Sequence, residues 1–457
     1  MRLISRRELG ALAAASLWPG RVSAAEAVFT SYAEAKPVLA WLARELPPEL
    51  AAPNQSKWDA WNRKNDRAIR TRLETGDLDS LVNLLLFGTS FTGQPRIRIE
   101  DMGAQARNGV LNARVADLVH GLAVPRGNER LAILRDLVLA KGVQFDSPEQ
   151  RKQAGVFILQ NLTRVLEEKR RFAERSTAAA AKSPDSTERI LAERSGLFRD
   201  RGVSLDTGIL ADYSVDLALQ RVKQQGGLGR VSRVAVIGPG LTFIDKDEAA
   251  AFDYFPPQTV QPFAALDSLL RLDLAGRDVS LTVLDISPLV LQHLQRARQQ
   301  ASKSIGYTIQ LPQDAARSWP ADLEDYWRRL GDRVGSAVEP IAVPATFSGL
   351  KTRAFTVTPE MVLRCQAANF DMVAQRMKIP TGERFDLVVA TNVFLYYDRF
   401  QQALAIENVA PMMKPGGLLL ANDELPESPE SGVHRSGVSA VTDGRAGRDA
   451  MAFYRKQ

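Results

Sequence analysis

Two glycines follow a short apolar run and would let a ligand approach the backbone closely. The run 234–237 leads directly into Gly238-Pro239-Gly240. Glycine has no side chain to obstruct a ligand, and it adopts positive φ angles readily. In a doubly wound sheet the ligand sits beyond the carboxyl ends of the strands, at a turn of this kind. The pair therefore predicts cofactor contacts at Gly238 and Gly240.

A carboxylate stands at the end of the next apolar run. Residues 281–284 are followed by Asp285, and an acceptor-only carboxylate there suits both hydroxyls of a ribose. The alternative is a turn that needs no ligand, because Ser287-Pro288 is a favourable N-cap and first-turn pair for a helix. The stretch 242–257 between the two motifs is longer than a minimal nucleotide-binding fold requires. It is interpreted as a lid or as a surface insertion.

A third group of polar residues follows the apolar run 387–390. Asn392 and Tyr396 come just after it, and Lys414-Pro415-Gly416-Gly417 precedes another apolar run at 418–421. The carbonyl oxygen of Asn392 could hold a cofactor or substrate group. The alternative for Tyr396 is packing at the start of a helix.

These last segments closely resemble class I S-adenosylmethionine-dependent methyltransferases, and the resemblance covers residues 231–456. It implies a cofactor, S-adenosyl-L-methionine, and transfer of its methyl group by in-line displacement. The segment 392–398, which follows the apolar run 387–390, is similar in particular to the corresponding segment of the protein-glutamate methyltransferases that modify chemotaxis receptors. In that group Asp371 would match an acidic residue that contacts the adenine amine, and Tyr396 a tyrosine near the methyl acceptor.

The first motif departs from the family pattern. Val236 stands where the family has an acid, and Thr242 where it has a third glycine. Thr242 is still expected to contact the cofactor. Asp245 or Asp247 is a candidate to replace the missing acid. Because this motif also differs from that of the chemotaxis group, the resemblance does not carry over that group's substrate.

The elements that must position these residues form an α/β domain. Short apolar runs alternate with helical segments at 259–274, 288–299 and 399–412, which indicates a parallel sheet covered on both faces. Two further strands at 437–441 and 450–455 are predicted to form a hairpin at one edge. The expected fold is a Rossmann-like, doubly wound methyltransferase sheet over residues 229–457, preceded by an all-α N-terminal domain.

The N-terminal domain is expected over residues 26–228. Apolar residues recur at three- and four-residue spacings over 32–46, 57–73, 78–87, 110–122, 130–139, 155–171 and 210–223. Trp58 and Trp61 are interpreted as one buried helix face, and His120 as an ordinary core or surface residue. We expect this domain to cap the carboxyl edge of the sheet and to shape the acceptor pocket.

Composition sets further limits. A chain of 457 residues suggests two or three domains, and 45% hydrophobic content is typical of globular proteins. The net charge of +6 is not gathered into a basic, aromatic-rich block, so no nucleic-acid partner is expected. One cysteine, Cys365, and three histidines provide no metal-site spacing. Cys365 is interpreted as a core residue.

Residues 1–25 resemble an export signal. Ser5-Arg6-Arg7 is similar to the twin-arginine motif, a modest apolar stretch follows, and small residues at 22–25 suit a signal peptidase. A periplasmic or secreted location follows, with no membrane span. The alternative is a frayed N-terminus or a misassigned start, and a cytoplasmic protein.

Three hypotheses for function remain open. In the first, the chain is an active methyltransferase with a small-molecule or protein acceptor. In the second, it is an exported, non-catalytic binding module that keeps the methyltransferase fold, which the altered first motif and the cytosolic supply of the cofactor would favour. In the third, the helical half is an interaction domain and the sheet a scaffold. The oligomeric state is not predicted.

Overall fold

The computed structural model describes residues 26–98, 108–182, 202–204, 207–243, 251–314, 318–347, 349–442 and 448–457. The expected signal at 1–25 and the two aspartates of the long loop, Asp245 and Asp247, lie outside the described residues. Within them no helix is both long enough and apolar enough to cross a membrane.

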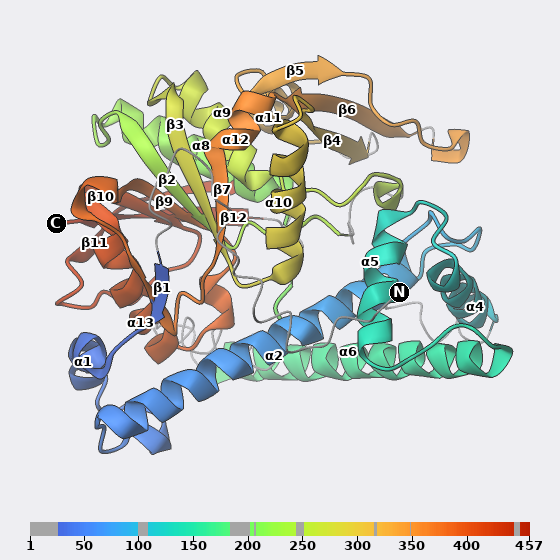
Figure 1. Cartoon of the computed structure of the whole chain (residues 1–457), viewed down its shortest axis with the longest axis horizontal. Coiled ribbons are helices and arrows are strands. Elements are labelled where there is room, and N and C mark those ends of the chain that lie inside the picture. Colours follow the sequence, from blue (N-terminus) through green and yellow to red (C-terminus); the bar gives the residue numbers. More distant parts are fainter. Residues whose placement is uncertain are drawn as a thin grey trace.

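A seven-stranded sheet forms the centre of the C-terminal half (Figure 1). Its spatial order is β11-β12-β10-β9-β2-β3-β7. The strands are β2 (Val231–Ile237), β3 (Ala275–Asp285), β7 (Cys365–Asn369), β9 (Phe385–Ala390), β10 (Met413–Ala421), β11 (Val433–Thr442) and β12 (Arg448–Lys456). The five strands from β10 to β7 are parallel. The chain adds β3 and β7 on one side of β2 and then returns to its other side for β9, so the topological switch point lies between β2 and β9.

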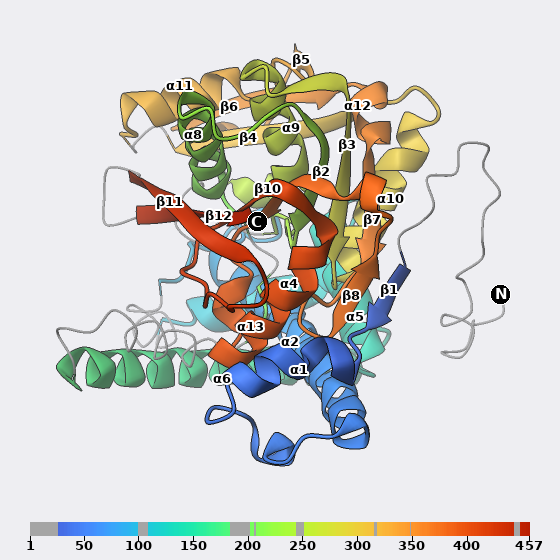
Figure 2. The ribbon, with the colours of Figure 1, turned by 90° about the vertical axis from the view of Figure 1, so that its left-hand side faces the viewer.

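The predicted hairpin is confirmed. β11 and β12 pair antiparallel, and β12 also pairs antiparallel with β10, so the hairpin closes one edge of the sheet (Figure 2). β7 forms the opposite edge. Its first residue, Cys365, is buried, and burial raises the pKa of its thiol to about 12, as expected of a core residue.

Both faces of the inner parallel strands are buried, as their apolar runs predict. Side chains of β2 alternate between two cores: Val234 and Val236 belong to one, Ala235 and Ile237 to the other. The first core contains α8 (Ile209–Gln224), α9 (Gln261–Arg271), α10 (Pro288–Ala301) and α12 (Pro359–Arg364). The second contains α13 (Arg399–Val409), α1 (Tyr32–Trp41) and the start of α2 (Gln55–Phe87).

Two small sheets were not predicted. β4 (Tyr307–Asp314), β5 (Gly335–Val338) and β6 (Leu350–Val357) form an antiparallel sheet between α10 and α12 in the chain, together with α11 (Ala321–Arg329). β1 (Glu26–Phe29) pairs antiparallel with β8 (Gln375–Lys378). Short 3₁₀ turns occur at Pro48–Leu50, Phe252–Tyr254, Ala345–Phe347, Thr381–Glu383, Phe394–Tyr396 and Ala410–Met412.

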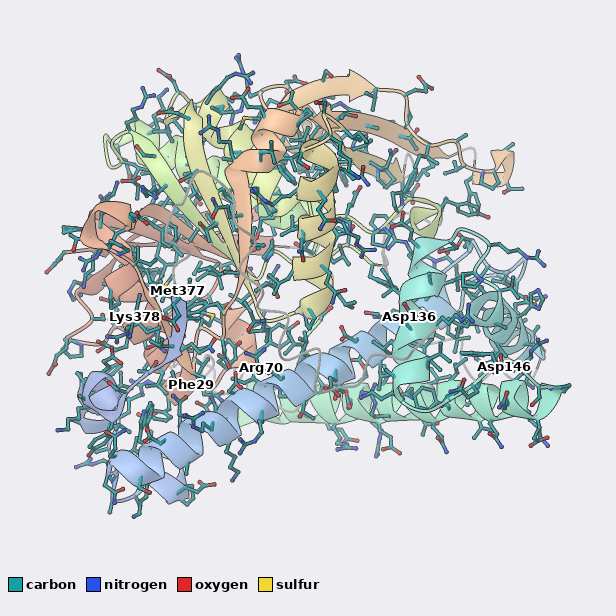
Figure 3. The ribbon with its side chains drawn as sticks, viewed as in Figure 1. Phe29, Arg70, Asp136, Asp146, Met377 and Lys378 are labelled. Carbon is teal, nitrogen blue, oxygen red and sulfur yellow. The ribbon has the colours of Figure 1, made fainter. Side chains whose placement is uncertain are left out.

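The helices of the N-terminal half are confirmed, and they divide between two bodies. The end of α2 packs with α4 (Val110–Ala123), α5 (Glu129–Ala140) and α6 (Pro148–Lys182) around a core of their own, which we call the helical body. Figure 3 places Asp136 and Asp146 in this body, away from the β1–β8 ribbon that carries Phe29 and Met377. β1, α1, the start of α2 and α8 pack on the sheet instead.

Helix α2 is continuous where the sequence predicted two helices. Trp58 and Trp61 form its buried N-terminal face, as interpreted, with ring centroids 5.4 Å apart. Gly76 lies inside the helix, and its lack of a side chain allows the segment 202–204 to approach the helix backbone closely. The Val203 amide donates to Arg72 O at 3.1 Å, and a Cβ on Gly76 would lie 1.8 Å from Val203 O.

This contact predicts whether replacing Gly76 by alanine stabilises or destabilises the protein. Alanine in a helix interior normally stabilises by about 1 kcal/mol relative to glycine. Gly76→Ala should instead lower the thermal unfolding midpoint by several degrees, because its Cβ collides with Val203 O. The control is Gly155→Ala in α6, where the Cβ would make an ordinary 3.5 Å contact with Val115 Cγ1. An equal rise in both variants would show that the Gly76 contact does not form.

Candidate functional site

A pocket lies at the carboxyl ends of β2, β3 and β9. Helix α2 runs below this edge of the sheet in the view of Figure 1. It is lined by Leu73, Val203, Ser204, Thr207, Ile237, Gly238, Gly240, Leu284, Asp285, Ile286, Phe370, Met372, Thr391, Asn392, Val393, Tyr396 and Tyr397. A pocket beside the switch point of a doubly wound sheet is the usual ligand position in this architecture.

Both predicted glycines line the pocket and need to be glycine. Their φ angles are +61° at Gly238 and +73° at Gly240, in the region that side chains disfavour. A Cβ on Gly238 would also lie 2.4 Å from Val393 Cγ1. The turn after β2 is therefore held against the exit of β9, and its backbone faces the pocket.

Asp285 is buried at the carboxyl end of β3 and lines the same pocket. Its Oδ1 accepts the Ser287 amide at 2.7 Å, and the amides of Ile286 and Gly240 also bond to the carboxyl. Burial outweighs these bonds and raises its pKa to about 7. In the free protein Asp285 therefore contributes stability at low pH that is lost as pH rises through about 7.

The alternative interpretation of this turn also has a structural counterpart. Ser287 is the N-cap of α10 and Pro288 follows it in the first turn, as the sequence predicted. The Ser287 side chain makes no capping bond. Asp285 instead accepts the Ser287 amide, so one carboxylate shapes the turn and faces the pocket.

Asn392 lines the pocket in a strained conformation. Its φ is +57°, unusual for a residue with a side chain, although asparagine tolerates it better than most. Asn422, at the end of β10, braces it: Asn422 Oδ1 accepts the Asn392 amide at 2.7 Å, and Asn422 Nδ2 donates to Asn392 Oδ1 at 2.5 Å. The carbonyl oxygen predicted to hold a ligand thus already accepts one bond and keeps one lone pair.

Tyr396 closes the pocket together with parts of the N-terminal half. Its carbonyl accepts Arg72 Nη1 from α2 at 2.9 Å, and its hydroxyl accepts the Ser204 amide at 3.1 Å. Tyr397 beside it is buried. The packing role that was the alternative for Tyr396 is therefore filled by Tyr397. Arg70, labelled in Figure 3, makes a further link from α2, because its Nη2 donates to Asn369 Oδ1 at the end of β7.

Two predicted cofactor residues are not among those that line the pocket. The Thr242 hydroxyl donates to Gln258 O at 2.9 Å, in a backbone bridge between the two residues. Asp371 Oδ1 accepts the amides of Val373 and Ala374 and so caps its own loop. The flanking residues Phe370 and Met372 line the pocket.

The absent acid of the first motif also has a structural reason. Val236 is buried in the middle of the sheet, paired with Val283 and Val389 on either side. A carboxylate there would enter the apolar core rather than the pocket.

Sequence reasoning missed the pocket residues that lie outside the motifs. Leu73 and Val203 come from the N-terminal half, and no local pattern sets them apart from other buried residues. Thr391 had a usable signal, since it directly precedes Asn392 at the exit of an apolar strand.

A buried arginine of the helical body holds the loop after the glycine turn. Arg130 on α5 donates to the carbonyls of Thr242 at 2.9 Å, Phe255 at 3.1 Å and Pro256 at 3.3 Å, and to that of Phe243. Its guanidinium also stacks on the ring of Phe243. The helical body therefore positions the loop that continues the glycine turn.

Asp253, an aspartate of this loop, connects the loop to the segment that follows α2. Asp253 accepts the amides of Thr89 and Ser90, at 2.9 and 2.7 Å, from the segment after α2. Asn128, the N-cap of α5, donates to the Ser90 hydroxyl at 2.8 Å. The loop and the helical body thus hold each other in place.

Neither a family model nor a curated protein matches the chain. Among solved structures, the N-methyltransferase NodS from Bradyrhizobium japonicum WM9 is 16% identical, covering 54% of this chain and 96% of its own, at a TM-score of 0.27. Magnesium protoporphyrin IX methyltransferase from Synechocystis PCC 6803 is 9% identical, covering 62% of this chain and 90% of its own, at a TM-score of 0.26. The rRNA methyltransferase aviRa from Streptomyces viridochromogenes is 13% identical, covering 54% of this chain and 84% of its own, at a TM-score of 0.26.

The Arg130 contacts predict a large loss of stability. Arg130→Met keeps the aliphatic volume but leaves buried carbonyls without a donor, and each such group costs about 1–3 kcal/mol. The free energy of unfolding in urea should fall by more than about 2 kcal/mol. Arg135→Met on the same helix is the control, because Arg135 Nε has no hydrogen-bond partner among the described residues. Equal losses in the two variants would contradict the proposed clamp.

Proposed function

We propose that the chain is an S-adenosylmethionine-dependent methyltransferase. The observation that carries this proposal is the meeting of Gly238, Gly240 and Asp285 around one pocket at the switch point of the sheet. These residues lie apart in the sequence, yet they provide a close backbone approach and a buried acceptor for ribose hydroxyls. The resemblance of the segments 383–398 and 411–420 to class I methyltransferases supports the same assignment.

The pocket fits the chemical groups of this cofactor. Asp285 matches the ribose diol, as in other nucleotide-binding sheets. Ile286, Phe370 and Met372 offer apolar surface next to Asp285, where the adenine ring would lie. The turn at Gly238 leaves room for the remaining, amino-acid part of the cofactor.

The residues of the pocket have to bind, orient and exclude water, because the bound cofactor supplies an already electrophilic methyl group. Leu73 and Val203 cover the pocket from the side opposite the sheet. Correct positioning of two reactants supplies up to about 7–11 kcal/mol of the barrier in ideal cases. Asn392 and Tyr396 are proposed to orient the acceptor, since both line the pocket on its β9 side.

The acceptor is proposed to be a small molecule or a protein carboxylate. Ser204 and Thr207 line the pocket from the N-terminal half, next to Tyr396. The side chains that meet the acceptor therefore come partly from outside the sheet domain, and these would determine its choice.

Calorimetry with the cofactor tests this proposal. The full chain should bind S-adenosylmethionine at micromolar concentration, and Asp285→Ala should abolish measurable binding. The matched control is Asp278→Ala, at the opposite end of the same strand, where the side chain is 77% exposed and pairs with Arg230. The control should bind like the parent chain. Absence of binding by the folded parent chain, or equal binding by both variants, would refute the assignment.

The pKa of Asp285 predicts how this affinity depends on pH. Ribose hydroxyls donate to the ionised carboxylate, so binding favours the deprotonated form. Because burial raises the pKa of Asp285 to about 7, the dissociation constant should rise about tenfold per pH unit below about 7 and level off above it. Titrations in buffers of different ionisation enthalpy should show protons released on binding at acidic pH.

Asp285→Asn should bind weakly at all pH values, without this dependence. The variant is needed because Asp77 on α2 is a second buried carboxyl whose pKa is raised to about 7, chiefly by burial. A pH dependence that persists in Asp285→Asn would assign it to another group.

A further inference from the structure

Asp77 is a buried carboxyl at the point where α2 passes from the sheet to the helical body. It lies one turn after Leu73, which lines the pocket, and one turn before Leu81, which belongs to the core of the helical body. Residues four apart share one face of a helix, so Asp77 continues the face that Leu73 presents to the pocket. Boundaries between two bodies of a protein are frequent positions for ligands.

The carboxyl of Asp77 lacks a hydrogen-bond donor that burial would ordinarily require. The residue is only 9% exposed, and its Oδ1 is buried and accepts no hydrogen bond from the described residues. The carboxyl of Asp285, by contrast, accepts backbone amides. A buried carboxylate without a donor is costly to stability, so Asp77 is suited to a partner that arrives with a ligand.

The segment 202–204 brings the pocket wall next to Asp77. Val203 packs against Gly76, the residue before Asp77, and a Cβ on Gly202 would lie 2.6 Å from the Gly76 nitrogen. Val203 and Ser204 both line the pocket. Asp77 therefore lies at the edge of the pocket where α2 meets this segment.

The charges around Asp77 are mostly negative. The charged groups that act on it are Glu74, Asp79, Lys141 and Asp285. The one cation, Lys141, pairs with Glu74 at 2.8 Å. Burial, and after it the charge of Glu74, raises the pKa of Asp77 to about 7. Such surroundings favour a cationic group of a ligand and disfavour a carboxylate.

We propose that Asp77 binds the nitrogen of an amine that accepts the methyl group. This inference rests on the proposed function and narrows its acceptor to an amine, since Asp77 and Asp285 would repel a carboxylate. The protonated amine gives one proton to the Asp77 carboxylate, from which it passes to solvent. The nitrogen lone pair then forms the bond to the methyl carbon while the carbon–sulfur bond breaks. The electron pair of that bond passes to sulfur, which leaves S-adenosylhomocysteine and a methylated ammonium.

The test compares two ligands by calorimetry on the full chain at pH 8. In sinefungin a carbon that carries a protonated amine replaces the sulfur of S-adenosylhomocysteine, so the amine probes the place where the acceptor nitrogen meets the methyl group. The parent chain should bind sinefungin more tightly. Asp77→Asn, which keeps the shape and removes the charge, should weaken binding of sinefungin about tenfold and leave S-adenosylhomocysteine unaffected, as expected for one hydrogen bond between charged groups.

Glu74→Gln is the matched control, because it removes the same charge from the same helix where the side chain is 64% exposed. Both affinities should stay within about twofold of the parent chain, since an exposed charge is screened by solvent. The ratio of the two affinities in the parent chain should fall below pH about 7, where Asp77 becomes protonated. Asp285 affects both ligands alike, so this ratio reports on Asp77.

Thermal unfolding separates a binding role from a structural one. Above pH 7, Asp77→Asn should unfold at the same temperature as the parent chain or higher, because it removes a buried charge. A lower midpoint, or an equal change for both ligands, would overturn the inference while leaving the proposed function intact. Failure of the parent chain to bind either ligand would overturn both.

Discussion

The continuous helix α2 is the element on which the rest of the structure depends. Its N-terminal tryptophans pack in one core of the sheet, Leu73 joins the other, and the apolar residues within 81–86 belong to the core of the helical body. A single rigid helix therefore sets the position of the helical body relative to the carboxyl edge of the sheet. The contact between Gly76 and Val203 brings a second segment onto the same stretch of helix, and Val203 lines the pocket. Leu73 of α2 lines the pocket as well.

The groups within the pocket are held by contacts that cross between neighbouring loops. Asp285 joins the turns after β2 and β3, Asn422 braces Asn392, and Gln261 fixes Thr391. Each of these three pocket residues thus has a hydrogen-bond partner from another loop or helix. Such support restricts rotamers before a ligand arrives, and a preorganised site loses less entropy on binding.

The sequence predicted the central strands, the edge hairpin and most helices, because continuous apolar runs and 3.6-residue patterns are local. It missed β7, an edge strand whose exposed positions break the apolar run. It also placed β1, α1 and α8 in the helical domain, since periodicity shows that a face is buried but not what covers it. Gly238, Gly240, Asp285, Asn392 and Tyr396 meet in the pocket. Thr242 and Asp371 were predicted by their position in the motifs, but their hydrogen bonds, which depend on loop geometry, engage neighbouring backbone.

The pocket at the switch point is proposed to hold S-adenosylmethionine, with its ribose at Asp285. A crystal structure of the chain with S-adenosylhomocysteine tests this most directly, because it locates each ligand group independently of affinity. The ribose hydroxyls should lie within hydrogen-bond distance of the Asp285 carboxylate, with the amino-acid part of the ligand beside the turn at Gly238. A ligand bound elsewhere, or one in this pocket with its ribose away from Asp285, would contradict the account.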